Sequence, residues 1–282
     1  MILPGSASQS FAAALAASTG HELGRVEYER FPDGEQMARV PADVDRAVVV
    51  ASTVSDAAHV ELLQLQDAAR EAGASEVVTV IPYMGYARQD RAFKAGQPVS
   101  SRAMARAVST GTDRVLTVTP HEGAVCDFFD VPAEPVEAAP RLAEPLPADL
   151  DDPLFLSPDE GAVDIAESVR DAYGAGETDY FEKDRDYDTG EVSVTPSDAP
   201  VEGRDVVVAD DIIATGSTMS EAVGVLNDRD AARVYVSCVH PMLAENALTK
   251  LQTAGVERVY GTDTIERAVS DVSAAPAVAE LL

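Results

Sequence analysis

Short apolar runs recur along the chain, and amphipathic segments of helical periodicity separate them. The strand-like runs are rich in Val, Ile and Leu and lie at residues 46–51, 76–82, 113–119, 154–157, 205–209, 233–239 and 257–261. The segments with helical spacing lie at residues 58–73, 100–110, 161–174, 218–228 and 243–254. Short buried strands that alternate with helices are typical of parallel sheets covered by helices. The sequence therefore predicts an α/β fold of the doubly wound kind.

A stretch rich in Pro, Ala and Asp at residues 132–153 interrupts this alternation and is typical of a domain connection. The 282 residues are long enough for two α/β domains. We therefore expect a boundary near residue 140, with one domain at 1–140 and a second at 141–282. The last residues of the chain could pack back on the first domain.

The composition limits the possible partners and the compartment. A formal net charge of -28 argues against nucleic acid or an anionic membrane as partner. Only Lys94, Lys183 and Lys250 are lysines, and an acidic, lysine-poor surface suits a salt-rich cytosol, so we hypothesise a halophilic source. Cys126 and Cys238 lie in unrelated segments, which favours reduced thiols. With no signal-peptide pattern and no apolar run of membrane-spanning length, we expect a cytoplasmic location.

Residues 207–218 carry the strongest functional signal. An apolar run delivers two adjacent carboxylates, Asp210 and Asp211, and the small-residue loop Ala214–Thr218 then leads into a helical pattern. Backbone N–H groups at such a helix N-terminus bind phosphate, while the two acids could accept hydrogen bonds from sugar hydroxyls or bind hydrated Mg²⁺. A phosphate at one end and a diol at the other describe a ribose 5-phosphate. The alternative is a surface turn whose acids are merely solvated.

Further polar segments follow other predicted strands, at the sheet edge where α/β proteins bind ligands. In residues 83–91, Arg88 and Arg91 could bind phosphate oxygens, and Gln89 or a tyrosine could address a nucleobase. The arginines could instead pair with the abundant acids. His121 and Asp159 follow two other strands and could hold a Mg²⁺ that also binds a polyphosphate, although a lone histidine is more often structural.

Two more charged segments are less specific. Lys183 and Arg185 lie two residues apart, so an extended segment would point both to one side, and a loop carrying them could close over a phosphoryl group. Ion pairs with the flanking acids explain these cations about equally well. Residues 31–35, Phe-Pro-Asp-Gly-Glu, predict a turn and by themselves indicate no function.

Taken together, these segments resemble the ribose-phosphate pyrophosphokinase (PRPP synthetase) family, and most closely its archaeal members. The resemblance follows family order through nearly the whole chain. Its motifs are GSASQ at 5–9, FPDGE at 31–35, VIPYMGYARQDR at 80–91, VTPHEG and FFDVP within 118–132, SPDEGA at 157–162, EKDR at 182–185 and DDIIATGST at 210–218.

The resemblance implies two type I phosphoribosyltransferase-like domains, each a mainly parallel sheet flanked by helices. It implies transfer of the pyrophosphoryl group of MgATP to the 1-hydroxyl of ribose 5-phosphate, giving PRPP and AMP, by a homo-oligomer of at least two subunits. Its implied ATP contacts are Phe31, Asp33 and Glu35, typically serving a neighbouring subunit, and Arg88 and Gln89. His121 and Asp159 would serve magnesium, Lys183 and Arg185 would act in catalysis, with Arg185 also on the substrate, and Asp210, Asp211, Ala214, Thr215, Gly216, Ser217 and Thr218 would hold ribose 5-phosphate.

The chain departs from the family pattern at Glu160 and Ala162, beside the expected metal site, and at Ala214 and Ser217 in the expected phosphate loop. We expect these changes to shift affinities and to leave catalysis intact. Two competing interpretations remain. A type I phosphoribosyltransferase would explain only the second half. A non-catalytic regulatory subunit would be expected to lose the cations at 183 and 185, and both are present.

Overall fold

The computed structural model describes the backbone of residues 1–185, 192–196 and 199–282, and the side chains of residues 1–181 and 199–282. Chain contacts divide these residues into two compact units, and the chain passes between them more than once. Unit 1 comprises Met1–Glu137, Asp263–Glu266 and Ser273–Leu282, and unit 2 comprises Ala138–Thr262 and Arg267–Val272. None of the helices in the described ranges is long and apolar enough to cross a membrane.

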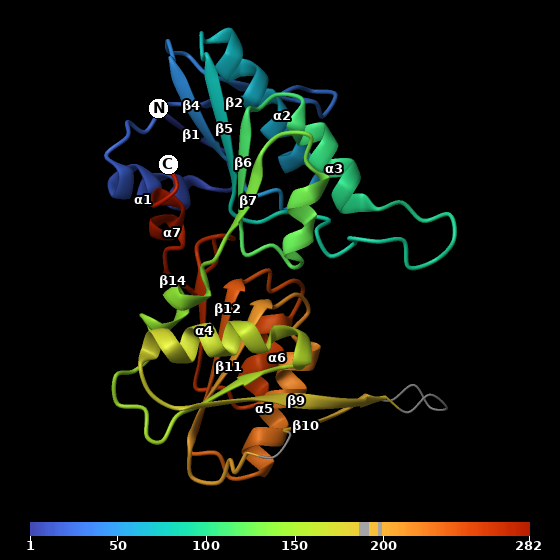
Figure 1. Ribbon diagram of the computed structural model, residues 1–282, viewed down its shortest axis with the longest axis vertical. Coiled ribbons are helices and arrows are strands. Elements are labelled where there is room, and N and C mark those ends of the chain that lie inside the picture. Colours follow the sequence, from blue (N-terminus) through green and yellow to red (C-terminus); the bar gives the residue numbers. More distant parts are fainter. Residues whose placement is uncertain (186–191, 197–198) are drawn as a thin grey trace. The chain divides into compact units, whose positions relative to one another are not determined.

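Unit 1 is built on a five-stranded parallel sheet with the order β1-β4-β5-β6-β7 (Figure 1). Its strands are β1 (Ile2–Pro4), β4 (Arg46–Val50), β5 (Glu76–Ile81), β6 (Arg114–Val118) and β7 (Ala133–Val136). Its helices are α1 (Gln9–Thr19), α2 (Asp56–Glu71), α3 (Ser100–Ser109) and α7 (Ala275–Ala279), and α7 packs against α1. The strands predicted at 46–51, 76–82 and 113–119 are confirmed because their buried Val, Ile and Leu residues fill the core beneath α2 and α3.

A separate antiparallel hairpin of unit 1 consists of β2 (Glu27–Arg30) and β3 (Gln36–Arg39). It is fastened to α2 by side-chain amides. The Gln36 Nε2 donates to the Ala57 carbonyl at 2.6 Å, and the Gln64 side chain bonds the backbone of both Gln36 and Ala38. The predicted turn at 31–35 is the connection between these two strands.

Unit 2 is built on a seven-stranded sheet with the order β10-β9-β8-β11-β12-β13-β14. Its strands are β8 (Leu154–Ser157), β9 (Glu177–Arg185), β10 (Val192–Pro196), β11 (Asp205–Ile212), β12 (Arg233–His240), β13 (Arg258–Thr262) and β14 (Ser270–Val272). Its helices are α4 (Val163–Tyr173), α5 (Ser217–Asp228) and α6 (Ala247–Thr253). All neighbouring strands are parallel except β9 and β10. The two sheets confirm the predicted α/β class.

Two polar segments contain strands that the sequence did not predict. Lys183, expected on a loop, lies on β9 of the antiparallel pair β9–β10 and is paired with Val194. Residues 132–153, expected to be a domain connection, include the division between the units at Glu137 and Ala138, and they also contain the edge strand β7 and a short 3-10 helix, η2 (Ala139–Ala143). Backbone hydrogen bonds to a neighbouring strand stabilise both strands, and the edge position of β7 accommodates Pro135. Strands that are stabilised in this way need few apolar residues, so the sequence contains little apolar pattern from which to predict them.

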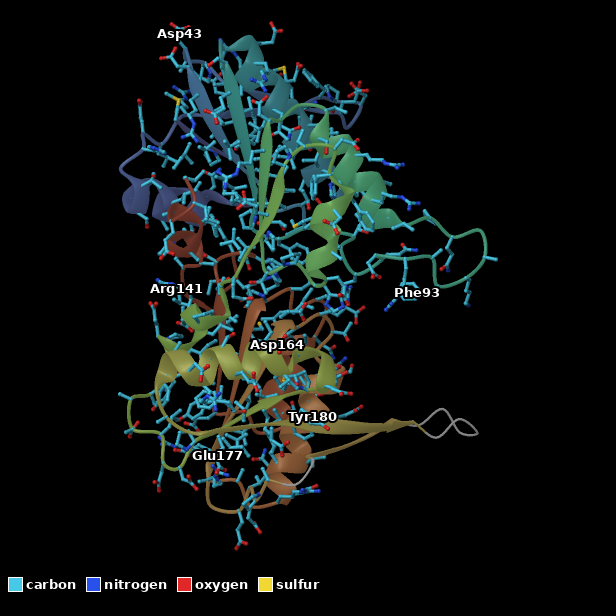
Figure 2. All side chains as sticks on the ribbon, in the orientation of Figure 1. Asp43, Phe93, Arg141, Asp164, Glu177 and Tyr180 are labelled. Atoms are coloured by element: carbon cyan, nitrogen blue, oxygen red, sulfur yellow. The ribbon has the colours of Figure 1, made fainter. Side chains whose placement is uncertain are left out.

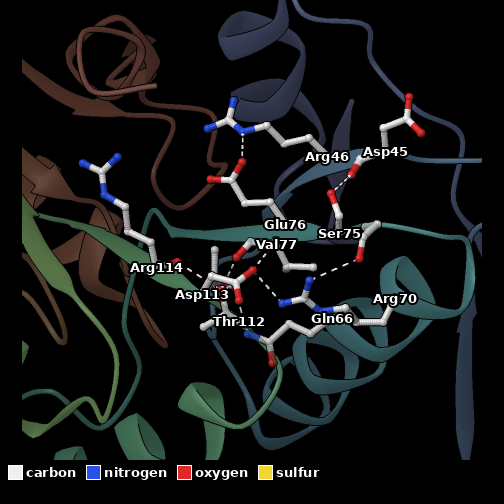
Figure 3. A network of polar contacts seen from close by, with 12 residues as sticks. Asp45, Arg46, Gln66, Arg70, Ser75, Glu76, Val77, Thr112, Asp113 and Arg114 are labelled. Carbon is white, nitrogen blue, oxygen red and sulfur yellow. Dashed lines mark hydrogen bonds and ion pairs between the residues drawn. The ribbon is translucent and has the colours of Figure 1, made fainter.

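Polar side chains close the amino ends of the strands of unit 1 (Figure 3). Asp113 accepts hydrogen bonds from the Arg70 guanidinium at 2.6 Å and from the Val77 N–H at 2.7 Å. Beneath them the buried Gln66 and Thr112 both bond the Thr79 hydroxyl. Burial disfavours a charge on Asp113, but these hydrogen bonds outweigh it, and its pKa is lowered. The network fixes α2 on the sheet at the end opposite the polar loops described below.

Unit 2 has an equivalent and more buried fastening at the start of β11. Asp205 is 1% exposed and binds the Arg233 guanidinium through both carboxylate oxygens, at 2.8 and 2.5 Å. It also accepts the Asp151 N–H at 2.7 Å. Burial opposes its charge, yet the hydrogen bonds from Arg233 and Asp151 lower the pKa of Asp205 below its ordinary value of 3.8. Strands β11 and β12 are therefore joined by charge as well as by their ladder.

We predict that Asp205→Asn lowers the free energy of unfolding by about 2 kcal/mol at neutral pH, because Arg233 loses a buried ionic partner. A carboxylate with a lowered pKa stabilises the fold above its unfolded pKa and loses this effect as the pH falls through the folded value. The difference from wild type should therefore shrink below about pH 4. Urea unfolding at several pH values measures it.

The matched control is Asp271→Asn, which breaks the exposed ion pair with Arg258. Exposed pairs contribute little, so its cost should stay below about 1 kcal/mol. Equal losses in the two variants would contradict the assignment of Asp205 as a buried ionic fastening.

Candidate functional site

The order of strands in unit 2 reverses between β8 and β11. From β8 the chain proceeds through α4 to β9 on one side, and from β11 it proceeds through α5 to β12 on the other side. Open α/β sheets bind ligands at the carboxyl ends of strands beside such a reversal. The residues at these two strand ends are Ser157 and Asp159 after β8, and Asp210 and Asp211 on β11. In unit 1 the sheet order follows the chain order without a reversal.

The carboxylates at this reversal are crowded. β11 continues through both predicted aspartates to Ile212, and Asp210 and Asp211 are half-buried. The Asp211 N–H donates to Asp210 Oδ1 at 2.8 Å. Burial, and then the negative charges of Asp211 and Asp159, raise the pKa of Asp210 well above its ordinary value. This environment disfavours the alternative of two merely solvated acids.

Asp159 contributes to this charge from the neighbouring strand end. It is half-buried and begins a 3-10 helix, η3 (Glu160–Ala162), where its Oδ1 accepts the Gly161 N–H at 3.1 Å. Glu160, the departure noted in the sequence, is exposed. The negative charges of Asp211 and Asp159 therefore both act on Asp210 within unit 2, an arrangement suited to hydroxyl groups that donate hydrogen bonds.

The loop after β11 is shaped to present backbone N–H groups. Gly216 begins α5 with φ 71° and ψ 4°, a left-handed conformation that favours glycine. A Cβ on Gly216 would also lie 3.1 Å from the Cβ of Ala247 on α6. In the described part of the chain, the backbone N–H groups of Thr215, Gly216, Ser217 and Thr218 find no acceptor. The predicted phosphate loop therefore has the donors, the glycine and the helix N-terminus that an anion needs.

The same loop is held from the side by the chain that follows β12. The Ile213 N–H donates to the His240 carbonyl at 3.2 Å, and the N–H groups of Leu243 and Ala244 donate to the carbonyls of Ile213 and Ala214 at 2.9 and 2.8 Å. Lys250 on α6 donates to the Thr215 carbonyl and to the Ser217 hydroxyl. The sequence reading missed Lys250, whose one available signal is the scarcity of lysine in the chain.

In unit 1 the predicted Phe31, Asp33 and Glu35 form a tight exposed turn. The Phe31 N–H donates to the Glu35 carbonyl at 2.8 Å, and the Asp33 carboxylate accepts the Glu35 N–H at 3.1 Å. Gly34 occupies the left-handed region with φ 93°. The ring of Phe31 is 37% exposed, so this turn places an aromatic side chain and two carboxylates on the surface.

The segment after β5 is folded against the amino end of α2. Tyr86 has φ 64°, donates its hydroxyl to Asp56, and places its ring 5.5 Å from the buried His59. This conformation leaves Arg88 exposed, and in the described part of the chain no carboxylate pairs with it. Arg88 is therefore available to an anion.

The other predicted residues of this segment have partners within it. The Gln89 side chain accepts from Ser100 at the start of α3 and donates to the Pro98 carbonyl. Arg91 lies 3.7 Å from Asp90 and 5.6 Å from the ring of Phe93, which is 59% exposed on the loop between β5 and α3 (Figure 2). Arg91 therefore follows the second interpretation given for the arginines, in which they pair with acidic side chains of the protein.

Both unit 1 segments are fastened to consecutive residues at the start of α2. Gln36, next to the exposed turn, bonds the Ala57 carbonyl, and Tyr86, two residues before Arg88, bonds the Asp56 carboxylate. The structure therefore brings the turn at 31–35 and the segment at 83–91 to one end of one helix. No hydrogen bond joins the two segments within the described ranges.

The remaining predicted residues belong to different units of the chain. His121 is exposed after β6 in unit 1, whereas Asp159 belongs to unit 2. Lys183 and Arg185 lie on β9, and their side chains are outside the described residues. The described residues contain no group of three or more His, Cys, Asp or Glu arranged to hold a metal ion.

Two family models match the chain, one in each half. Residues 1–111 match the N-terminal domain of ribose phosphate pyrophosphokinase, and residues 140–275 match the phosphoribosyl transferase domain. A ribose-phosphate pyrophosphokinase from Halobacterium salinarum is 66% identical over 284 residues, covering 100% of both chains. One from Methanopyrus kandleri is 45% identical over 271 residues, covering 94% of this chain and 92% of the relative.

A solved structure gives the same result for the fold. The phosphoribosylpyrophosphate synthetase from Mycobacterium smegmatis superposes with a TM-score of 0.84 at 26% sequence identity, covering 100% of this chain and 96% of that one. The predicted resemblance to archaeal members is confirmed by the two archaeal relatives. The predicted fold of two phosphoribosyltransferase-like sheets is confirmed by the family models and this structure.

We predict that Asp210→Asn stabilises the unliganded protein by about 1 kcal/mol at pH 8, a gain typical of relieving a functional site. A carboxylate with a raised pKa costs stability as the pH rises from its unfolded value, so the advantage of Asn should be absent near pH 4 and level off at higher pH. Denaturant unfolding at constant KCl concentration measures it.

Asp67→Asn on the exposed face of α2 is the control, because it removes one negative charge outside the crowded site. Its effect should be within about 0.5 kcal/mol. A loss of stability in Asp210→Asn would show that the charge of Asp210 is well accommodated and would contradict the crowding.

Proposed function

The chain belongs to the ribose-phosphate pyrophosphokinase family, and from that membership we infer that it transfers the pyrophosphoryl group of ATP to the 1-hydroxyl of ribose 5-phosphate, giving PRPP and AMP. The chain is thus a transferase of nucleotide biosynthesis, a ribose-phosphate diphosphokinase. Its charged substrates favour a cytoplasmic location.

One observation carries this function: the similarity extends through both halves of the chain at 66% identity. A type I phosphoribosyltransferase would account for the match at residues 140–275 and would leave the match at 1–111 without a role. A regulatory subunit is not favoured by any feature of the described residues. The similarity of both halves therefore supports a single activity that needs both of them.

Ribose 5-phosphate is proposed to bind at the carboxyl end of β11. The unpaired N–H groups of residues 215–218 and the amino end of α5 would receive the 5-phosphate. Asp210 and Asp211, at the end of the strand that precedes the loop, would accept hydrogen bonds from the ribose hydroxyls. Binding of the 5-phosphate at one end and of the ribose hydroxyls at the other would fix the position of the anomeric oxygen. Such positioning is a main requirement for its attack on phosphorus.

ATP is proposed to bind to unit 1 segments at the amino end of α2. The exposed Arg88 would pair with phosphate oxygens, and Gln89 would hold the segment against α3 through Ser100 and Pro98. Phe31 with Asp33 and Glu35 would contact the adenine and ribose. Since residues 31–35 are all exposed on one chain, we propose that this turn serves a second copy, which makes the active form at least a dimer.

The transferred group carries several negative oxygens, so the reaction needs cations more than a strong base. Lys183 and Arg185 on β9 are proposed to neutralise that charge. Mg²⁺ is proposed to be held by Asp159 and His121, whose carboxylate oxygen and imidazole nitrogen are suitable ligands, with water and substrate oxygens supplying most of its coordination. When bound, it would neutralise charge on the triphosphate.

We predict that AMP forms only when ATP, ribose 5-phosphate and Mg²⁺ are all present, and that EDTA abolishes its formation. The assay is run at low and at molar KCl, because the acidic surface suits high salt. A type I phosphoribosyltransferase would release no AMP in this mixture. Absence of AMP at every salt concentration would contradict the proposed function.

Replacing Lys183 tests the proposed catalytic cation. Lys183→Ala should lower kcat by about a thousandfold with little change in the unfolding midpoint, since transition-state charge stabilisation is lost. Lys183→Arg keeps the charge and should retain part of the activity. An unchanged kcat in the alanine variant would remove Lys183 from the mechanism.

A further inference from the structure

Lys250 lies against the phosphate loop from a helix outside it. Its Nζ donates to the Thr215 carbonyl at 3.2 Å and to the Ser217 Oγ at 3.1 Å. Ala247, one turn earlier on α6, is the residue that a Cβ on Gly216 would meet. One face of α6 is therefore packed on residues 215–217, and the ammonium group is part of that contact.

The ammonium has neutral partners in a strongly acidic protein. The chain has 49 acidic residues and three lysines, yet within the described ranges Lys250 forms no ion pair with a carboxylate. Its partners are a carbonyl and a hydroxyl. The positive charge thus stays uncompensated beside a loop whose N–H groups lack acceptors, which favours an anion there.

The contact also fixes how the loop presents its donors. In a trans peptide the C=O and the following N–H point in opposite directions. With the Thr215 carbonyl held toward Lys250, the Gly216 N–H points away from Lys250. Because the Ser217 oxygen accepts from Lys250, its single O–H remains to donate elsewhere, and it has no acceptor in the described part of the chain.

We propose that Lys250 is a positioning residue for the phosphate end of the substrate, orienting the Thr215–Gly216 peptide and the Ser217 hydroxyl toward a phosphate monoester. The inference rests on the proposed function, which assigns a sugar phosphate to this loop. Lys250 acts through the loop on affinity, and the bonds that form and break in the reaction lie at the other end of the sugar.

The test compares Lys250→Met and Lys250→Arg with wild type in turnover and in calorimetric titration with ribose 5-phosphate and with unphosphorylated ribose. Lys250→Met should raise both the Kd and the KM for ribose 5-phosphate by about tenfold, the size of one lost charge-assisted hydrogen bond. It should leave kcat and the KM for ATP within about twofold, since uniform binding is lost. Lys250→Arg should recover most of the affinity, and binding of ribose should not change.

Arg229→Gln is the charge control, because it removes one positive charge at the far end of α5 and should leave the Kd unchanged. Ser217→Ala should also raise the Kd, and its effect should not add to that of Lys250→Met if both act through one hydroxyl. Unfolding midpoints within a few degrees of wild type establish that the variants fold.

The binding and turnover results separate this inference from the proposed function. An unchanged Kd in Lys250→Met overturns the role of Lys250, whether or not the wild type forms AMP. AMP formation by the wild type supports the function independently of Lys250. A loss of affinity in Lys250→Met that Arg does not recover, or an equal loss for ribose, would indicate general loop damage and would also overturn the inference.

Discussion

The site of unit 2 depends on acidic side chains gathered at the carboxyl ends of two neighbouring strands. Asp210 and Asp211 end a strand in the interior of the sheet, and Asp159 adds its charge from the next strand end. At the opposite end of β11, Asp205 is paired with Arg233 of β12. A ligand that donates hydroxyl hydrogen bonds or supplies a cation at the carboxyl end reduces the repulsion among these carboxylates. This reduction adds to the free energy of binding from the ligand's own contacts.

The two units of the chain place their predicted ligand residues differently on similar sheets. Unit 2 contains a reversal of strand order, and its crowded carboxylates and phosphate loop lie on the strands at that reversal. Unit 1 has none, and its predicted ligand residues lie instead on loops fastened to the start of α2 by Gln36 and Tyr86. In the proposed function, the small sugar phosphate binds at strand ends, which hold their side chains in fixed positions. The larger nucleotide binds to exposed loops, which can also contact a second copy of the chain.

The sequence predicted the parts of this structure that bury apolar side chains. The runs that became β4, β5, β6, β8, β11, β12 and β13 alternate with the predicted helices because each strand is covered by a helix. Several of the strands that it missed depend on pairing: β9 and β10 are polar, and β7 is an edge strand containing proline. Others are short, such as β1 and β14 with three residues each, and leave too little pattern to recognise. At the site of unit 2, Asp210, Asp211 and residues 215–218 indicated the phosphate loop, but the raised pKa of Asp210 depends on burial and partly on Asp159, which is distant in sequence. In unit 1, the contact of Gln89 with Ser100 at the start of α3 likewise could not be predicted from the sequence.

An acidic surface creates a difficulty for any enzyme that must bind phosphate, because its many carboxylates can pair with exposed cations. Arg91 illustrates this, since Asp90 and Phe93 already occupy it. Backbone N–H groups and a helix dipole avoid this competition, because they bind anions without a cationic side chain that could form an ion pair with a carboxylate. Lys250 keeps its charge in another way, because its ammonium donates to two neutral oxygens of the loop. The positive charge therefore lies close to the loop's N–H groups and is not neutralised by a carboxylate. In a chain of this net charge, such neutral anchoring is what allows a side-chain cation to contribute to anion affinity.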